Sequence, residues 1–271
     1  MQRPYVHGYD AREAERLHDQ ATTLKDLLHD GTAYPAGARV LEAGCGTGAQ
    51  TLTLAQRSPL ARFTSVDISA DSLAKASQQV DAAGIRNVAF MQADLFALPF
   101  EPASFDHVFV CFVLEHLARP LQALQALRRL LAPGGSITVI EGDHGSAYFH
   151  PDSAAARRAI DAQVRLQAAA GGNALIGRQL YPLLVEAGFD IPSVSPRMVY
   201  VDASRPAWVE GFTRNTFNAM IEGVRDAALS AGMASAEDFD AGVRDLHRTE
   251  QADGVFCYTF FKGVARAHEG S

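Results

Sequence analysis

The sequence predicts an α/β fold built around a parallel sheet, and three observations carry this prediction. Apolar runs of strand length alternate with segments of helical periodicity between residues 39 and 143, as in strands joined by crossover helices. The strand-like runs are continuously apolar, which is expected where helices cover both faces of a sheet. The chain has 271 residues, 48% of them hydrophobic, and can therefore bury a substantial core.

The first elements are expected to follow one another closely. A helix is predicted to begin at Asp10, where Glu13 completes a capping box, and to end at Gly31. Strands are then expected at residues 39–45, 62–69, 88–95, 105–112 and 136–143, and helices at about 47–57, 71–83 and 121–131. Gly84 closes the second of these helices, and the sequence Pro-Gly-Gly stops the third.

The pattern changes after Asp143. Helices at about 153–170 and 177–187 precede a strand at 193–202, and a last strand is expected at 255–267. Residues 205–252 are predicted to be helical, with no good strand. We interpret this segment as a cap inserted into the sheet domain.

Composition excludes several classes of protein. Lys and Arg number 24 against 31 Asp and Glu, so the net charge of −7 lacks the basic footprint of a nucleic-acid binder. No apolar run is long enough to span a bilayer, and the polar N-terminus does not read as a signal peptide. Cys45, Cys111 and Cys257 are far apart and form neither a metal-ligand spacing nor an obvious disulfide set. We therefore expect a cytoplasmic protein with no metal site and no nucleic-acid or membrane partner.

The stretch Val40–Gly48, with the sequence VLEAGCGTG, is the most informative motif. A strand that ends in glycines and leads into a helix brings backbone N–H groups close to a ligand, because no Cβ holds the ligand away. Dinucleotide-binding loops use G-x-G-x-x-G. Here Gly44, Gly46 and Gly48 form G-x-G-x-G, one residue short of that spacing, and Glu42 lies two residues before the first glycine.

The order acid-x-Gly-Cys-Gly-x-Gly resembles the first motif of the S-adenosylmethionine (SAM)-dependent methyltransferases of class I. Further motifs of this family follow in the expected order. Asp67 ends the second strand, 23 residues after Gly44, and QADLFALPF contains Asp94. The stretches FDHVFVCFVLEHL, LRRLLAPGGSITVIE and LYPLLVEAGFD are similar to later motifs. The most similar group is the small-molecule branch, with the quinone, sterol and glycine-type methyltransferases.

The resemblance implies a Rossmann-like, seven-stranded, mostly parallel sheet whose last strand is antiparallel, with the helical cap as an insertion. It implies three parts: residues 1–38 as a helical segment over the cofactor cleft, residues 39–204 and 253–271 as the SAM-binding α/β domain, and residues 205–252 as the cap. SAM would lie across the carboxyl ends of the first, second and fourth strands, where the strand order reverses.

The resemblance also assigns roles to cofactor residues. The amides of the glycine loop would face the methionine part of SAM, and Asp67 would accept the ribose hydroxyls. Asp94 would meet the adenine amino group, with Leu95 against the ring. Cys111 and Phe112 would flank the methionine carboxylate. The implied cofactor-binding residues are Tyr9, Glu42, Gly44, Cys45, Gly46, Gly48, Asp67, Ile68, Asp94, Leu95, Cys111 and Phe112.

Methyl transfer is an in-line displacement at carbon, so much of the catalysis can come from positioning, and a base is needed only if the nucleophile loses a proton. Asp143 and His144 lie in EGDHGS, residues 141–146, where the fifth strand is expected to end. His116 is similar in position to a histidine that phosphoethanolamine methyltransferases pair with an N-terminal tyrosine. The catalytic candidates are therefore His144, Asp143 and His116. The plainer interpretation of Asp143 and His144 is a hydrogen-bonded loop with a solvated histidine, and the plainer interpretation of His116 is the start of a helix.

The acceptor is expected to be a small molecule, methylated on oxygen, nitrogen or an activated carbon. Arg214 and Arg197 each offer a cation for a carboxylate or phosphate of the substrate, although such residues are more often solvated or paired within the protein. The aromatic residues at helical spacing around Arg214 are more typical of a core than of a pocket. The substrate-binding candidates are Glu141, Tyr148, Arg197, Trp208, Phe212 and Arg214. Two alternatives stay open: a SAM-binding subunit without catalysis, and an NAD-dependent oxidoreductase, which the glycine spacing disfavours. A homo-oligomer is also possible.

Overall fold

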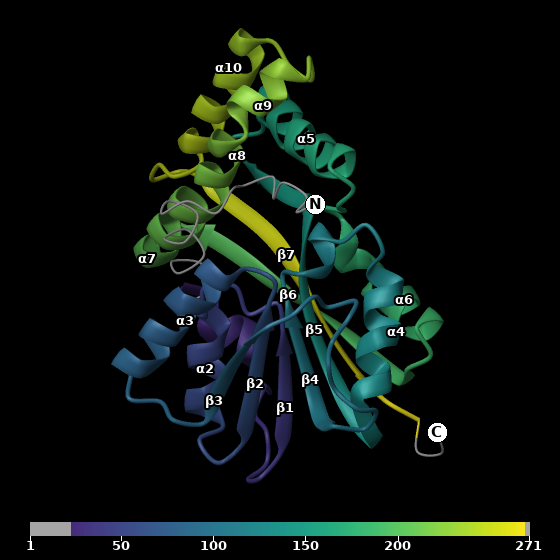
Figure 1. Cartoon of the computed structure of the whole chain (residues 1–271). Coiled ribbons are helices and arrows are strands. Elements are labelled where there is room, and N and C mark those ends of the chain that lie inside the picture. The colour runs from purple at the N-terminus through teal and green to yellow at the C-terminus, as the bar shows by residue number, and fades with distance from the viewer. Residues whose placement is uncertain (1–22, 269–271) are drawn as a thin grey trace. The chain divides into compact units, whose positions relative to one another are not determined.

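The computed structural model describes residues 23–268 (Figure 1). Its sheet has seven strands in the order β3-β2-β1-β4-β5-β7-β6. The strands are β1 Arg39–Ala43, β2 Arg62–Asp67, β3 Val88–Gln92, β4 Phe105–Cys111, β5 Leu131–His150, β6 Asp190–Asp202 and β7 Val255–Arg266. Pairs from β3 to β5 are parallel, and β7 runs antiparallel between β5 and β6. The predicted fold class, including the antiparallel last strand, is confirmed.

The helices of the sheet domain also lie where the sequence predicts them. They are α2 Ala49–Arg57, α3 Ala70–Ala82, α4 Pro120–Leu130, α5 Ala154–Ala169 and α6 Leu180–Glu186. Local chemistry explains their starts, because the Ser69 side chain accepts a hydrogen bond from the amide of Ser72 at 3.2 Å and Pro120 begins α4. In Figure 1, α2 packs beside α3 and α4 beside α6.

Residues 205–252 are helical in nearly their whole length, as predicted. The elements are α7 Pro206–Trp208, a π-helix over Val209–Asn218, α8 Ala219–Gly223, α9 Arg225–Ser230 and α10 Ala236–Arg248. No strand interrupts these residues, all of which the structure describes.

The chain divides by compactness into two units. Of the described residues, unit 1 comprises 23–25, 142–176 and 196–260, and unit 2 comprises 26–141, 177–195 and 261–268. This division differs from the three sequence-based parts, because the helices of 205–252 group with α5 rather than standing alone. The segment 1–38 was expected over the cofactor cleft, and most of it lies outside the described residues.

Unit 2 is held by contacts between distant parts of the sequence. The side chain of Lys262 is buried, and its Nζ donates hydrogen bonds to the carbonyl of Asp30 at 2.6 Å and to Oγ1 of Thr32 at 2.5 Å. The aliphatic core lies along β1, β4 and the inner face of α4, where Leu41, Val108 and Leu127 are fully buried. Within the described residues, no helix combines the length and apolar character required to cross a membrane.

The fifth strand is longer than predicted. The sequence indicates a strand over 136–143 that gives way to a loop, but β5 continues through EGDHGS to His150. The predicted end of this strand is therefore wrong. Glu141, Asp143 and His144 lie within a strand and are buried, with exposed fractions of 0, 2 and 7%.

Candidate cofactor and active site

The three glycines after β1 all adopt left-handed backbone conformations. The φ angles are 77° at Gly44, 53° at Gly46 and 87° at Gly48. A Cβ on Gly44 would lie 2.5 Å from Cγ2 of Val113, and one on Gly48 would lie 2.9 Å from the Cβ of Ala76, so both are needed for close packing. Within the described part of the chain, a Cβ on Gly46 would meet nothing within 4 Å. Gly46 is therefore the glycine of this loop that borders open space.

The amides of the glycine loop are used within the protein. The amides of Gly44 and Cys45 donate to the carbonyl of Val66 at 2.8 and 3.0 Å, and that of Gly48 donates to the carbonyl of Cys45 at 3.0 Å. The amide of Gly46 donates to Oδ2 of Asp67 at 2.8 Å. The expectation that the loop amides face a ligand is therefore wrong for these four. The glycines instead give the loop its turn and let the neighbouring elements approach.

Glu42 forms buried hydrogen bonds next to the glycine loop. Its carboxylate is buried and accepts hydrogen bonds from the hydroxyls of Thr51 at 2.7 Å and Ser65 at 2.6 Å. Burial raises the pKa of Glu42 to about 7, against the lowering effect of these two hydrogen bonds. Glu42 therefore joins β1 to α2 and β2. Burial also raises the pKa of the Cys45 thiol, which argues against a nucleophilic role for this cysteine.

The ends of β2 and β3 present side chains that suit an adenosine. Asp67 is half-buried, and its Oδ1 accepts a hydrogen bond from the amide of Ser69 at 2.9 Å. Each carboxylate oxygen has two lone pairs, so both oxygens of Asp67 retain capacity for a hydroxyl donor. Ile68 is 47% exposed, Leu95 is half-buried, and the carboxylate of Asp94 is exposed. An apolar surface beside an accessible carboxylate fits a flat base that carries an amino group.

The loop after β4 is bent sharply. Cys111 ends the strand and is buried, and burial raises the pKa of its thiol. Phe112 has a φ of 57°, a left-handed conformation that is unusual for a residue with a side chain. A 3₁₀ helix then covers Leu114–His116. His116 belongs to unit 2, and its Nε2 lies 3.5 Å from Oε1 of Glu115.

His144 has a partner that sequence reasoning missed. Its Nδ1 lies 2.7 Å from the hydroxyl of Tyr258, a fully buried residue of β7 in the same unit. A Cβ on Gly142 would lie 2.4 Å from this hydroxyl, so the glycine makes room for it. The neighbouring Asp143 accepts the amide of Gly145 at 3.1 Å. The signal for Tyr258 in the sequence is only that of an aromatic residue in an apolar strand.

The substrate candidates of unit 1 differ in their surroundings. Phe212 is buried in an aromatic cluster with Phe256, Tyr258 and Phe260, as expected of a core residue. Trp208 is half-buried, and Cζ of Arg205 lies over its ring, 5.3 Å from the ring centroid. Two candidates lie on strands: Tyr148 on β5 is 52% exposed, and Arg197 on β6 is half-buried.

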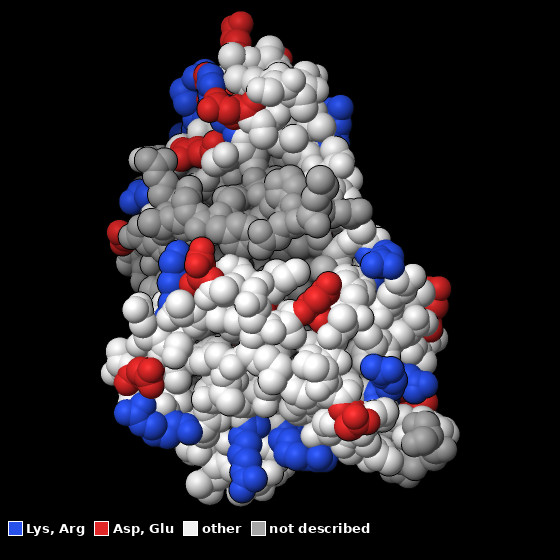
Figure 2. All heavy atoms as spheres, viewed as in Figure 1, with Lys and Arg blue, Asp and Glu red and all other residues white. Residues whose placement is uncertain are grey.

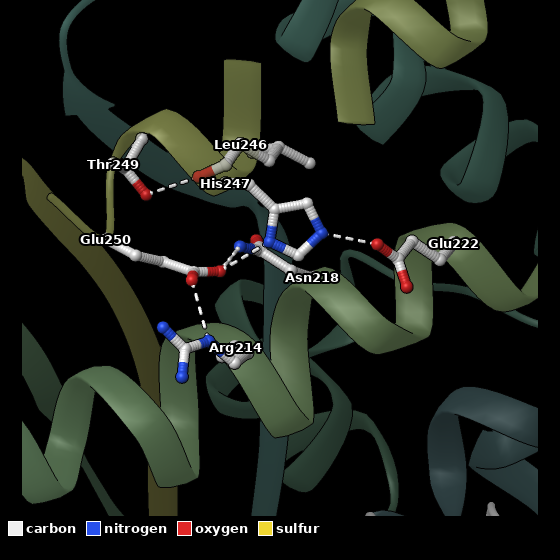
Figure 3. Close-up of polar contacts among 7 residues, drawn as sticks. All are labelled: Arg214, Asn218, Glu222, Leu246, His247, Thr249 and Glu250. Atoms are coloured by element: carbon white, nitrogen blue, oxygen red, sulfur yellow. Dashed lines mark hydrogen bonds and ion pairs between the residues drawn. The ribbon is translucent and has the colours of Figure 1, made fainter. Parts of the chain in front are cut away.

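Arg214 belongs to a polar cluster of unit 1 (Figure 3). Its Nε donates to Oε2 of Glu250 at 2.8 Å, and Nδ2 of Asn218 donates to Oε1 at 2.7 Å. Nδ1 of His247 lies 2.6 Å from the same Oε1, and its Nε2 is paired with Glu222. Glu250 is 4% exposed in its side chain, against 51% for Arg214. Arg214 is thus engaged by a buried carboxylate, which lowers its value as a substrate anchor.

Two further expectations concern sites that the structure does not display. Tyr9, expected to close over the cofactor, lies outside the described residues. Among the residues that are described, no group of three or more histidine, cysteine or acidic side chains is arranged to hold a metal ion.

Comparisons with known proteins bear on this geometry. A family model described as a methyltransferase domain matches residues 40–135. The chain is 34% identical over 219 residues to a 37.1 kDa protein of transposon TN4556 from Streptomyces fradiae, covering 78% of this chain and 61% of that protein. It is 28% identical over 225 residues to the 27-O-demethylrifamycin SV methyltransferase of Amycolatopsis mediterranei (strain S699), covering 82% of this chain and 76% of that enzyme. The chain thus spans less than two thirds of its Streptomyces fradiae relative.

A solved structure agrees in fold. The (4+2)-cyclase SpnF matches with a TM-score of 0.59 and 23% identity, covering 91% of this chain and 81% of that chain. The matched domain begins at β1 and contains the glycine loop, Asp67, Asp94 and the β4 loop. On these grounds residues 40–135 are similar to a methyltransferase domain, and the chain shares its fold with the matched structure.

Proposed function

We propose that the protein is an enzyme that transfers the methyl group of SAM to a small molecule. The observation that carries the proposal is the arrangement at the carboxyl ends of β1 and β2, where Gly46 lies beside the Asp67 carboxylate and no described residue would meet a Cβ on it. This arrangement lies inside the matched methyltransferase domain. SAM supplies a methyl group on a sulfonium, which is already a strong electrophile.

The residues present fit this cofactor. Asp67 would accept the ribose hydroxyls, Ile68 and Leu95 would cover the adenine faces, and Asp94 would accept its amino group. Cys111 and Phe112, at the end of β4, would border the methionine part. Glu42 would act through the loop that it supports, since its carboxylate is already bonded to Thr51 and Ser65.

Oxygen is the acceptor atom favoured by the rifamycin relative, whose name describes an O-methylation. A hydroxyl must lose its proton near the transition state, so such an acceptor needs a base. His144 would serve in this role, with Tyr258 holding its Nδ1, because an imidazole titrates near neutral pH. Asp143 and His116 remain the other two catalytic candidates.

A small-molecule acceptor also agrees with the surface. The face in Figure 2 intersperses Lys and Arg with acidic residues and shows no basic stripe of the kind that follows a nucleic-acid backbone. The fold by itself does not decide the activity, since the SpnF structure with the same fold is described as a cyclase. A SAM-binding subunit without turnover is therefore the second candidate.

The test is calorimetric titration with S-adenosylhomocysteine (SAH), with NADH in parallel. We expect micromolar affinity for SAH and no heat from NADH. Binding of NADH alone would refute the proposal. Turnover with radiolabelled SAM and a panel of hydroxylated acceptors would then separate the enzyme from the non-catalytic subunit, and His144→Ala should abolish turnover while leaving SAH affinity unchanged.

A further inference from the structure

A buried carboxyl group of β5 reaches the loop after β4. Oε1 of Glu141 accepts hydrogen bonds from the amides of Val113 at 3.0 Å and Leu114 at 2.8 Å, and the amide of Glu115 also points to this carboxyl group. Glu141 is fully buried, and its Oε2 has no hydrogen-bond partner within the described part of the chain. All four residues belong to unit 2.

The amides that Glu141 accepts are the first ones of the 3₁₀ helix that ends at His116. Such amides have no partner within the helix and need an acceptor from elsewhere. The preceding residue, Phe112, is in a left-handed conformation that is unfavourable for a residue with a side chain and persists only when its surroundings hold it. The Glu141 carboxyl group is part of what holds this bend.

The loop in turn meets the glycine loop. The Val113 side chain packs over Gly44 so closely that a Cβ there would lie 2.5 Å from Cγ2 of Val113. The position of Val113 therefore defines the space left to the glycine loop at the end of β1. A change in the hydrogen bonds of the Val113 amide would move the side chain that packs on Gly44.

From this chain of contacts we infer that Glu141 is a positioning residue for cofactor binding: it fixes the Val113–Glu115 turn, which fixes the glycine loop. The inference rests on the proposed function, because it assigns Glu141 to the same cofactor site. It also revises the expectation of a substrate contact for Glu141. Burial and the nearby Glu115 raise the pKa of Glu141 well above the ordinary value, and the hydrogen bonds from the three amides lower it only in part. Either protonation state of the group can accept these hydrogen bonds.

The experiment compares Glu141→Gln with Glu141→Met by calorimetric titration of the full chain with SAH. Glutamine keeps one acceptor oxygen for the amides of Val113 and Leu114, and its NH₂ group would occupy the position of Oε2, which has no hydrogen-bond partner among the described residues. Methionine has a similar length but no comparable acceptor. We expect Glu141→Gln to bind within threefold of the wild type and Glu141→Met to bind at least tenfold more weakly. Glu101→Met, at an exposed glutamate of the same unit, is the matched control and should bind normally.

The outcomes are distinguishable. Wild-type protein that fails to bind SAH would refute the proposed function, whereas wild-type binding with equal affinity in folded Glu141→Met would refute only the role of Glu141. If Glu141→Met does not fold, amide hydrogen exchange of the wild-type protein tests the role of Glu141 instead. The amides of Val113 and Leu114 should be strongly protected and become more so with SAH, and exchange at the rate of free peptide would overturn the inference.

Discussion

Asp67 shows how a single side chain can serve both the protein and a ligand. Its two oxygens accept the amides of Gly46 and Ser69, which tie the glycine loop to the end of β2. The same oxygens are the ones proposed to receive the ribose hydroxyls. Sequence reasoning identifies the second role from the spacing to Gly44, but the first role appears only in the structure.

Replacing Asp67 by Asn should weaken SAH binding at least tenfold, because hydrogen bonds to a charged carboxylate are worth about 1.5–3 kcal/mol and Asn keeps only one acceptor oxygen. Isothermal calorimetry measures the loss. Asp81→Asn, at an exposed ion pair with Arg86, should bind as the wild type does. Unchanged affinity in Asp67→Asn would show that the ribose assignment is wrong.

Replacement by alanine should have different effects at two glycines of the loop. Gly44→Ala should lower the thermal midpoint strongly, since its Cβ would collide with Val113 in addition to the left-handed strain of about 1–2 kcal/mol. Gly46→Ala should cost only that strain, because its Cβ meets open space, and yet it should abolish SAH binding by occupying that space. Differential scanning fluorimetry and calorimetric titration separate the two effects. Normal SAH affinity in Gly46→Ala would place the cofactor elsewhere.

At the scale of elements, strand and helix positions follow from the sequence because apolar runs and helical spacing are local signals. The exception is the far part of β5, where the letters EGDHGS indicate a loop. Gly142 and His144 are strand residues here because Tyr258, 114 residues beyond His144, lies beside them. The sequence does not predict the contact between Arg214 and Glu250 for the same reason. Partners so distant in the sequence leave no trace in the local pattern.

The cluster around His247 predicts a pH-dependent stability of the unit 1 helices. His247 of α10 lies between Glu222 of α8 and Glu250 after α10, with Arg214 of the π-helix on the far side of Glu250 (Figure 3). Burial lowers the pKa of His247, but hydrogen bonds to the two glutamates outweigh burial, and the pKa is raised from the ordinary 6.5. On the side of α10 that faces α5, Arg158 pairs with Asp238, and Ser153 donates a hydrogen bond to Asp245.

A raised folded-state pKa means that the stabilisation is complete below about pH 6.5 and is lost as the pH rises through the folded value. Thermal midpoints should therefore fall between pH 6 and pH 9 by more in the wild type than in His247→Gln. The exposed His150→Gln provides the control, and its profile should follow the wild type. Parallel profiles for the wild type and His247→Gln would contradict the prediction.

At the scale of the whole molecule, the chain passes between the two units at five points, and β5, β6 and β7 each contribute residues to both. Backbone continuity along three strands should make the units unfold together. We expect a single calorimetric transition whose midpoint rises when SAH is added. At an SAH concentration of one hundred times the dissociation constant, the free energy of unfolding should increase by about 2.7 kcal/mol. Two transitions, of which only one responds to SAH, would show that the units unfold independently.

The place of β7 in the sheet has a consequence for synthesis. The last strand of the sheet to leave the ribosome lies between two earlier ones, β5 and β6. Until residues 255–266 emerge, β6 lacks its neighbour in the sheet, β7, and one edge of β5 is unpaired. The hydrogen bond from Lys262 to Thr32 cannot form before then either. Exposed strand edges invite pairing with other chains. A nascent chain that stalls before β7 should therefore depend on chaperones, although most of the sheet has already been made.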